Sequence, residues 1–250
     1  MESSVLVKTF AILEAMSPNQ EAASLASLAQ RTGLNKPTVH RILGELARMG
    51  YVDRVRTGRY ELTPRWRRLA RGSHITELTA AAEPILQRLH ARTRETVNLG
   101  VLQQNQVRYL IVLESPQALR RVIERDNTDP FHCTALGRAI VSHLPLQQQQ
   151  HLLSRARLSR RTPRTTTDAK HLRRLLAKAK RDGYAVECDE TDLGVTCIGS
   201  PVFDQAGVVA AISLSAPSVR VSPKRQRALI QAVCQAAKRL SQVLQQQEQE

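Results

Sequence analysis

TGLNKPTVHRILGELARMGYVDR, residues 32–54, combines a helical repeat with a basic end. Its apolar residues recur at the i, i+3, i+4 and i+7 positions that share one face of an α-helix. They are Val39, Ile42, Leu43 and Leu46. Asn35 is a good N-cap and Gly50 a good C-terminal stop, so we expect a helix from residue 36 to about 48.

Two shorter helical patterns precede this one. Residues 5–16 predict a first helix, and Ser24 caps a short second helix that stops at Gly33. The first helix has four apolar residues that we expect to be available for a core. They are Val5, Phe10, Ile12 and Leu13.

A basic hairpin is predicted after the third helix. Residues 51–63 contain two β-like runs around Thr57-Gly58. Helix, short helix, turn, longer helix and hairpin, in that order, form the sequence outline of a winged helix-turn-helix. The alternative is a solvated helix and hairpin in an unrelated α+β domain.

The outer face of the third helix suits the DNA major groove, where each base pair presents a distinct pattern of donors and acceptors. The residues expected to face bases are Lys36, Thr38, His40 and Arg41. The hairpin arginines expected beside a phosphate strand or in the minor groove are Arg54, Arg56 and Arg59. We expect the missing side chain of Gly44 to allow a neighbour to approach closely.

Charge and composition narrow the class of protein. The 250 residues carry a net charge of +15, which favours a polyanionic partner, nucleic acid before a membrane surface. No apolar run of about 18 residues predicts a membrane span, and the N-terminus lacks the pattern of a signal peptide. We therefore expect a cytoplasmic chain whose four cysteines are reduced, with no metal site and no cofactor.

Basic residues gather in two stretches. Residues 35–71 hold ten Lys and Arg against three acids, which fits the predicted DNA-binding region. Residues 151–181 hold eleven against Asp168 alone. The second stretch can be a solvated amphipathic helix, with Leu172, Leu175, Leu176 and Ala179 as its buried stripe, or a surface for phosphate or an acidic partner.

The rest of the chain predicts a linker helix followed by a mixed domain. Residues 66–95 have helical spacing, with a bend or restart at Pro84. Strands are predicted at 97–103, 106–115, 119–125, 184–188, 194–203 and 207–216. Helices are predicted at 133–144, 146–153, from Asp168 to Gly183, and at about 222–246.

Several separate motifs resemble the IclR family of bacterial transcriptional regulators. TGLNKPTVHRILGELARMGYV resembles its DNA-binding helix. RETVNLGVL, FHCTALGRAIVS and GYAVECDETDLGVTCIGSPVFDQAGVVAAISLSAPSVRVS resemble its effector-binding domain. The resemblance implies an α+β fold. A winged helix-turn-helix (1–64) and a linker helix region (65–95) would precede a GAF/PAS-like α/β effector domain with a curved antiparallel sheet (96–250).

The resemblance also implies an effector cavity, a homodimer or homotetramer, and control of a catabolic operon through a palindromic operator. The effector residues implied are Ala135, Leu136, Glu187, Cys197, Ser213 and Ser215. Two serine hydroxyls on one strand face, with backbone N–H groups where the helix at 133–144 begins, could hold a small organic or aromatic acid. Without the resemblance, Cys197 can equally be a buried apolar residue, and Ser213 and Ser215 can be ordinary strand residues.

Two other classes of function compete with a regulator. A cysteine enzyme would need a base within reach of Cys133 or Cys197, and adjacency of His132 to Cys133 does not supply one. An architectural nucleic-acid binder would show steep salt dependence without sequence preference. We therefore expect a regulator without catalytic residues.

Overall fold

The computed structural model describes residues 4–16, 22–55, 58–103, 105–123 and 127–247, leaving out the side chains of 64–74 and 247. The chain divides into two compact units, residues 1–76 and 77–250, with the boundary inside helix α4 (Pro64–Thr93). Within the described ranges, none of the helices combines the length and apolar character that crossing a bilayer requires.

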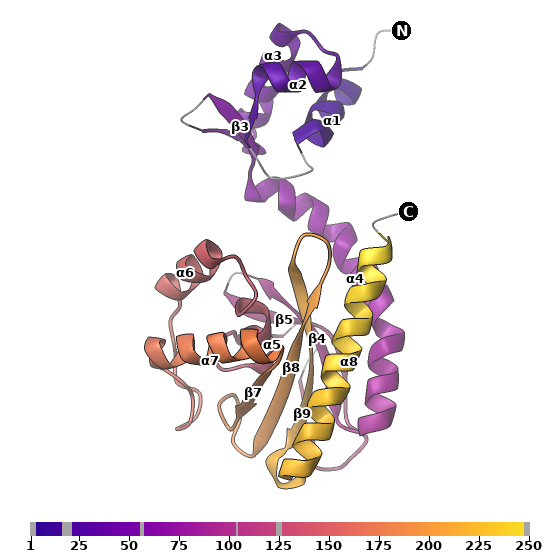
Figure 1. Ribbon diagram of the computed structural model, residues 1–250, viewed down its shortest axis with the longest axis vertical. Coiled ribbons are helices and arrows are strands. Elements are labelled where there is room, and N and C mark those ends of the chain that lie inside the picture. The colour runs from indigo at the N-terminus through magenta and orange to yellow at the C-terminus, as the bar shows by residue number, and fades with distance from the viewer. Residues whose placement is uncertain (1–3, 17–21, 56–57, 104, 124–126, 248–250) are drawn as a thin grey trace. The chain divides into compact units, whose positions relative to one another are not determined.

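The first unit is a small helical domain with a three-stranded sheet (Figure 1). Its helices are α1 (Val5–Met16), α2 (Leu25–Thr32) and α3 (Lys36–Arg48). Its strands are β1 (Ala23–Ser24), β2 (Val52–Arg54) and β3 (Arg59–Leu62), in the antiparallel order β1-β3-β2. The predicted winged helix-turn-helix is confirmed.

Local capping fixes the two helices of the turn motif. The Ser24 hydroxyl accepts the Ser27 N–H at 3.1 Å, and the Asn35 side-chain oxygen accepts the Thr38 N–H at 2.9 Å. Gly33 ends α2 with a φ of 68°, a left-handed conformation that glycine adopts without steric cost. These caps are as the sequence predicts.

The core of this unit differs from expectation at α1. Ile12 and Leu13 are buried, but Val5 and Phe10 are exposed, so their assignment to the core is wrong. The apolar pattern predicts a helix, but it does not specify which of its apolar residues another element covers. The exposed large apolar residues of α1 are Val5, Leu6, Val7 and Phe10.

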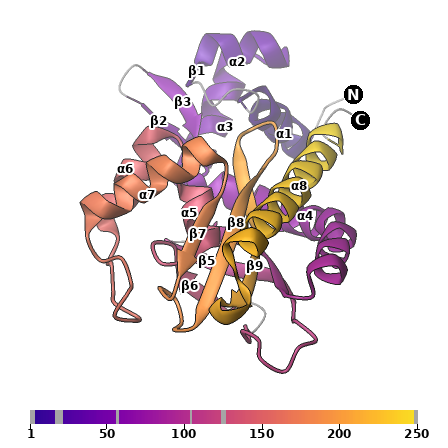
Figure 2. The same cartoon turned by 60° about the horizontal axis from the view of Figure 1, so that its bottom comes forward.

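The second unit contains one six-stranded antiparallel sheet, ordered β6-β5-β4-β9-β8-β7 (Figures 1 and 2). The strands are β4 (Thr96–Gln103), β5 (Gln106–Leu113), β6 (Thr128–Pro130), β7 (Ala185–Cys188), β8 (Val195–Phe203) and β9 (Val208–Pro217). The helices are α5 (Ala135–Val141), α6 (Leu146–Arg155), α7 (Ala169–Asp182), the short 3₁₀ turn η1 (Ser218–Arg220) and α8 (Pro223–Gln247).

Helices cover both faces of the sheet. Short helix α5 packs on β4, β8 and β9, whereas α8 packs on the opposite face of β8 and β9 with the end of α4 alongside it. Gly199 permits the close approach of α5, because an added Cβ would lie 2.6 Å from the Ala135 carbonyl oxygen. Helix α4 continues through Pro84, so of the predicted bend or restart the restart is wrong.

One predicted strand is absent from the described residues. Residues 119–123, part of the predicted strand at 119–125, are irregular, and β6 pairs with β5 instead. Thr96 explains part of this path, since its hydroxyl donates to the Arg121 carbonyl oxygen at 3.1 Å and accepts the Ser115 N–H at 3.1 Å. The segment is held by side-chain contacts rather than by a strand ladder.

Gly44 offers a direct test of the α3 environment. An added Cβ there meets no described atom within 4 Å, so the prediction that a neighbour approaches closely is wrong. Gly44→Ala should raise the free energy of unfolding of the first unit by about 0.5–1 kcal/mol, because alanine favours helix. Thermal unfolding followed by circular dichroism measures this.

Gly137→Ala is the matched control, because its Cβ would lie 2.5 Å from the Phe131 carbonyl oxygen. It should destabilise the second unit. A destabilising Gly44→Ala would contradict the open environment of α3.

Candidate functional site

The outer face of α3 is polar and open. Lys36, His40 and Arg41 are exposed and Thr38 is half-buried, whereas the predicted stripe from Val39 to Leu46 lies in the core. None of the three cationic or imidazole side chains forms an ion pair with a described residue. The face is therefore free to contact a partner.

The hairpin presents its arginines in the same manner. Arg54 and Arg59 are exposed, while Tyr60 between the outward residues of β3 is buried. Strand pairing aligns Arg54 with Tyr60, and the Val55 N–H donates to the Arg59 carbonyl oxygen at 2.9 Å. Arg56, also expected in this wing, lies outside the described residues, as does Thr57 of the predicted turn.

A narrow cavity in the second unit brings together all six residues expected to contact an effector. Ala135 and Leu136 come from the start of α5, Glu187 from β7, Cys197 from β8, and Ser213 and Ser215 from β9. The remaining lining residues are Tyr109, Arg121, Thr134 and Thr191. The cavity has room for about one water molecule.

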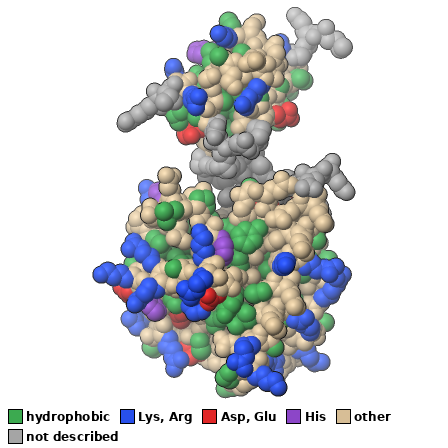
Figure 3. All heavy atoms as spheres, viewed as in Figure 1, with side chains coloured by type: hydrophobic (Ala, Val, Ile, Leu, Met, Phe, Trp, Pro, Cys, Tyr) green, Lys and Arg blue, Asp and Glu red, His purple; other side chains and the backbone are tan. Residues whose placement is uncertain are grey.

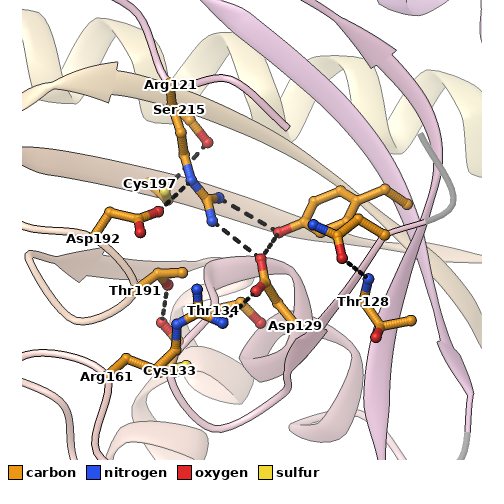
Figure 4. Close-up of polar contacts among 12 residues, drawn as sticks. Arg121, Thr128, Asp129, Cys133, Thr134, Arg161, Thr191, Asp192, Cys197 and Ser215 are labelled. Carbon is orange, nitrogen blue, oxygen red and sulfur yellow. Dashed lines mark hydrogen bonds and ion pairs between the residues drawn. The ribbon is translucent and has the colours of Figure 1, made fainter. Parts of the chain in front are cut away.

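Arg121 brings a positive charge to this cavity, and its side chain is only 8% exposed. Its Nε donates to Asp192 Oδ2 at 2.8 Å and its Nη2 to Asp129 Oδ2 at 3.0 Å. The Tyr109 hydroxyl donates to the same Asp129 oxygen at 2.8 Å. Figure 4 shows Arg121 between the two aspartates, with Cys197 and Ser215 beside it. The buried charge is thus paired, as burial requires.

Sequence reasoning missed Arg121 and the other three lining residues. Arg121 follows Arg120 in a stretch whose pattern predicts a strand, and nothing local separates the buried arginine from its exposed neighbour. Asp192, one of its partners, is 71 residues away. The N-cap Thr134 offered a signal, since its hydroxyl accepts the Gly137 N–H at 3.1 Å and so starts α5.

The strand side of the cavity is lined by hydroxyl, thiol and carboxyl groups. Cys197 Sγ and Ser215 Oγ are 3.2 Å apart, and the Asn98 amide donates to Ser213 Oγ at 3.2 Å. Asn98 Oδ1 is buried without a hydrogen-bond partner among the described residues. An unpaired buried oxygen is costly, so it favours a donor from a bound molecule or water.

Glu187 is the titratable acid of the cavity. It is buried, and its carboxylate accepts the Glu190 N–H at 3.0 Å. Burial raises the pKa of Glu187 to about 6, although the hydrogen bonds and nearby arginines act in the opposite direction. The group therefore exchanges its proton close to neutral pH.

A buried ion pair holds the loop after β7 against α5. Arg138 donates to both carboxylate oxygens of Glu190 at 2.6 Å, and the Thr166 N–H donates to Glu190 Oε2 at 2.8 Å. The Thr191 hydroxyl of the same loop donates to the Cys133 carbonyl oxygen at 2.8 Å. These contacts position Thr191 at the cavity wall.

The thiols of Cys133 and Cys197, the two cysteines considered as nucleophiles, are unsuited to nucleophilic chemistry. Burial raises the pKa of Cys133 to about 11 and that of Cys197 well above its usual value. A nucleophilic cysteine needs a lowered pKa instead. His132 directs Nε2 to the Ser159 carbonyl oxygen at 3.1 Å. Across the described residues, no three His, Cys, Asp or Glu side chains cluster as metal ligands would.

Comparison with protein families matches both units of the chain. Residues 5–56 match the IclR helix-turn-helix domain, and residues 72–242 match the C-terminal domain of the bacterial transcriptional regulator IclR. Together the two matches cover most of the chain, in the order that the sequence resemblance implies.

Curated relatives are similar over most of their length. The chain is 31% identical to the HTH-type transcriptional regulator KdgR of Escherichia coli (strain K12), covering 96% of this chain and 91% of the relative. It is 34% identical to the HTH-type transcriptional regulator BhcR of Paracoccus denitrificans (strain Pd 1222), covering 87% and 79%. These relatives are transcriptional regulators, not enzymes.

A solved structure adds a ligand-bound comparison. An IclR homologue from Microbacterium hydrocarbonoxydans complexed with 4-hydroxybenzoate is 28% identical, with a TM-score of 0.63 over 96% of this chain and 99% of the homologue. The two family matches and the relatives lead to one conclusion: this chain belongs to the IclR family of DNA-binding transcriptional regulators.

Proposed function

We propose that this regulator reads a specific operator through the outer face of α3 and the wing. The residues proposed to face bases are Lys36, Thr38, His40 and Arg41, and those proposed for phosphate or the minor groove are Arg54, Arg56 and Arg59. The described members other than half-buried Thr38 are exposed, which supports this role. In this proposal residues 1–64 bind DNA, 65–95 link, and 96–250 sense an effector, in the cytoplasm.

We further propose a homodimer or homotetramer on a palindromic operator. The apolar outer face of α1 supports it: Leu6 is 68% exposed and Phe10 54%, and clustered apolar side chains on a surface mark protein contacts. Two-fold symmetry in the protein requires matching half-sites in the DNA, about 34 Å apart or at another fixed span.

The proposed effector is a small carboxylic acid from a degradation pathway, whose catabolic operon the protein controls. The observation that carries this proposal is the buried Arg121 guanidinium beside the hydroxyls of Ser213 and Ser215. A guanidinium pairs with a carboxylate through two parallel hydrogen bonds. Asn98 is not a lining residue, but its amide donates to Ser213 Oγ, and its buried, unpartnered Oδ1 is the acceptor that we propose for the hydroxyl of a hydroxy acid. The 4-hydroxybenzoate bound by the Microbacterium homologue has both groups.

Glu187 makes binding of an acid depend on a proton. An ionised Glu187 would repel an effector carboxylate in the same cavity, whereas a protonated Glu187 removes the repulsion and can donate a hydrogen bond. Its pKa of about 6 keeps the protonated form accessible near neutral pH. Acid binding is therefore expected to be accompanied by proton uptake.

The size of the cavity implies that binding moves part of its wall. Space for about one water molecule cannot hold even a short acid. Most lining residues belong to strands or α5, but Arg121 lies on the irregular segment 114–123. Such segments open at lower free-energy cost than the strands of a core. We propose that an acid draws Arg121 from its aspartates and shifts this segment.

The same segment is tied to the end of the linker helix α4. The Ser115 hydroxyl donates to the Arg94 carbonyl oxygen at 2.7 Å, and His90 Nε2 lies 2.8 Å from the Glu114 carbonyl oxygen. Thr96 binds the Arg121 carbonyl oxygen at 3.1 Å. A shift of segment 114–123 would therefore act on α4, which leads to the DNA-binding unit. The acid biases DNA binding only by its differential affinity for the two arrangements.

Selection of binding sites from a random duplex pool tests the DNA half of the proposal. We expect an enriched inverted repeat. On that repeat Arg41→Ala should weaken binding by about 1–3 kcal/mol if Arg41 contacts a guanine edge, measured as Kd against single-base variants. Equal losses on every sequence would assign Arg41 to phosphate. A pool without an enriched motif would favour the architectural alternative.

Calorimetric titration of small hydroxy, keto and aromatic acids between pH 5 and 8 tests the effector half. Kd should be nearly constant below about pH 6 and rise toward tenfold per pH unit above it, as Glu187 ionises. Glu187→Gln stays neutral and should remove this dependence. An unchanged pH profile in that variant would assign the proton elsewhere, and binding of amines but no acids would overturn the effector class.

A further inference from the structure

The basic stretch 151–181 divides into two kinds of residue in the structure. Four of its basic side chains form ion pairs: Arg161 with Asp129, Arg164 with Asp189, and Lys178 and Arg181 with Asp182. Arg161 and Arg164 pair with residues outside the stretch, whereas Lys178 and Arg181 form exposed pairs within α7. The other seven are exposed and form no ion pair with any described residue. They are Arg155, Arg157, Arg160, Lys170, Arg173, Arg174 and Lys180.

The unpaired residues of α7 form one continuous face, which we call the α7 basic face: Lys170, Arg173, Arg174 and Lys180. Leu172, Leu176 and Ala179 are buried on the opposite side of the helix, which leaves the basic face directed to solvent. Figure 3 shows Lys and Arg side chains gathered over α6 and α7. A side-by-side arrangement of like charges at i, i+3 and i+4 destabilises a helix. An anion bound to this face would relieve the repulsion among these charges.

We propose that the α7 basic face binds the phosphate backbone of duplex DNA, as a second contact besides the winged helix-turn-helix. From Lys170 to Lys180 the helix rises about 15 Å, along which one DNA strand presents about four phosphates. Arg173 and Arg174 supply planar guanidinium groups, which bind phosphate oxygens in pairs. The spacing and chemistry of the face therefore fit a polyanion with regular charges.

The absence of apolar anchors on this face favours DNA over an acidic protein. Protein interfaces take most of their binding energy from buried aromatic or large apolar side chains. The exposed apolar residues of α7 are only Ala169 and Ala177. Phosphate contact needs charge alone. The inference rests on the DNA-binding role of α3, because DNA held there is at high effective concentration for a second contact.

The proposal is tested by measuring how binding of the full chain to a mixed-sequence duplex depends on salt concentration. The duplex has about 40 bp, which is roughly four helical turns. The variant combines Arg173→Gln with Arg174→Gln. The slope of log K against log salt should become shallower by about 1.8, since each lost phosphate contact contributes about 0.9. The matched control combines Lys224→Gln with Arg227→Gln, two exposed residues of α8, and should leave the slope unchanged. Circular dichroism verifies that each variant is folded.

Equal slope changes in both variants would show a net-charge effect without a localised contact, and would overturn the proposal. An unchanged slope in the α7 variant would also overturn it. The alternative partner of the α7 basic face would then be an acidic polypeptide. Lys36→Gln with Arg41→Gln separates the two proposals. If this variant weakens DNA binding while the α7 variant does not, the role of α3 stands and only the second contact fails.

Discussion

A buried guanidinium has to be neutralised, and the arrangement of the second unit around Arg121 follows from that constraint. Asp129 and Asp192 supply the charge, and the Tyr109 hydroxyl completes the cluster. Because Asp129 lies on β6 and Asp192 on the loop after β7, the arginine ties together opposite edges of the sheet. An anion that enters the cavity competes with these aspartates. Binding and rearrangement are then two aspects of one exchange of ion pairs, in which Arg161 still pairs with Asp129.

The other elements around the cavity confine that exchange of ion pairs to one part of the cavity wall. Strands β4, β8 and β9 and helix α5 form a close-packed wall, with Gly199 allowing α5 to sit against the sheet. The buried Arg138–Glu190 pair holds the loop that carries Thr191. Segment 114–123 pairs with no described strand. Its attachments include the ion pairs of Arg121 and hydrogen bonds to Thr96, Arg94, His90 and Arg220. We therefore propose it as the part of the wall that moves, and it is attached where α4 ends.

The elements that the sequence predicts well are those with local causes. The caps at Ser24 and Asn35 and most of the buried stripe of α7 depend on residues a few positions apart and are confirmed. Leu175 is the exception in that stripe, because it is half-buried. The six cavity residues came from the family resemblance, and the structure brings them together without testing their role. Arg121 was missed because its burial depends on partners 8 and 71 residues away. Phe10 was misplaced because apolar character alone does not specify its partner.

Hydrogen–deuterium exchange of the full chain, with and without a bound acid, tests most directly whether cavity and linker are coupled. The account predicts altered exchange in segment 114–123 and in the C-terminal turns of α4, in addition to protection at the start of α5. Altered exchange confined to α5 and the strands, with segment 114–123 and α4 unchanged, would contradict it.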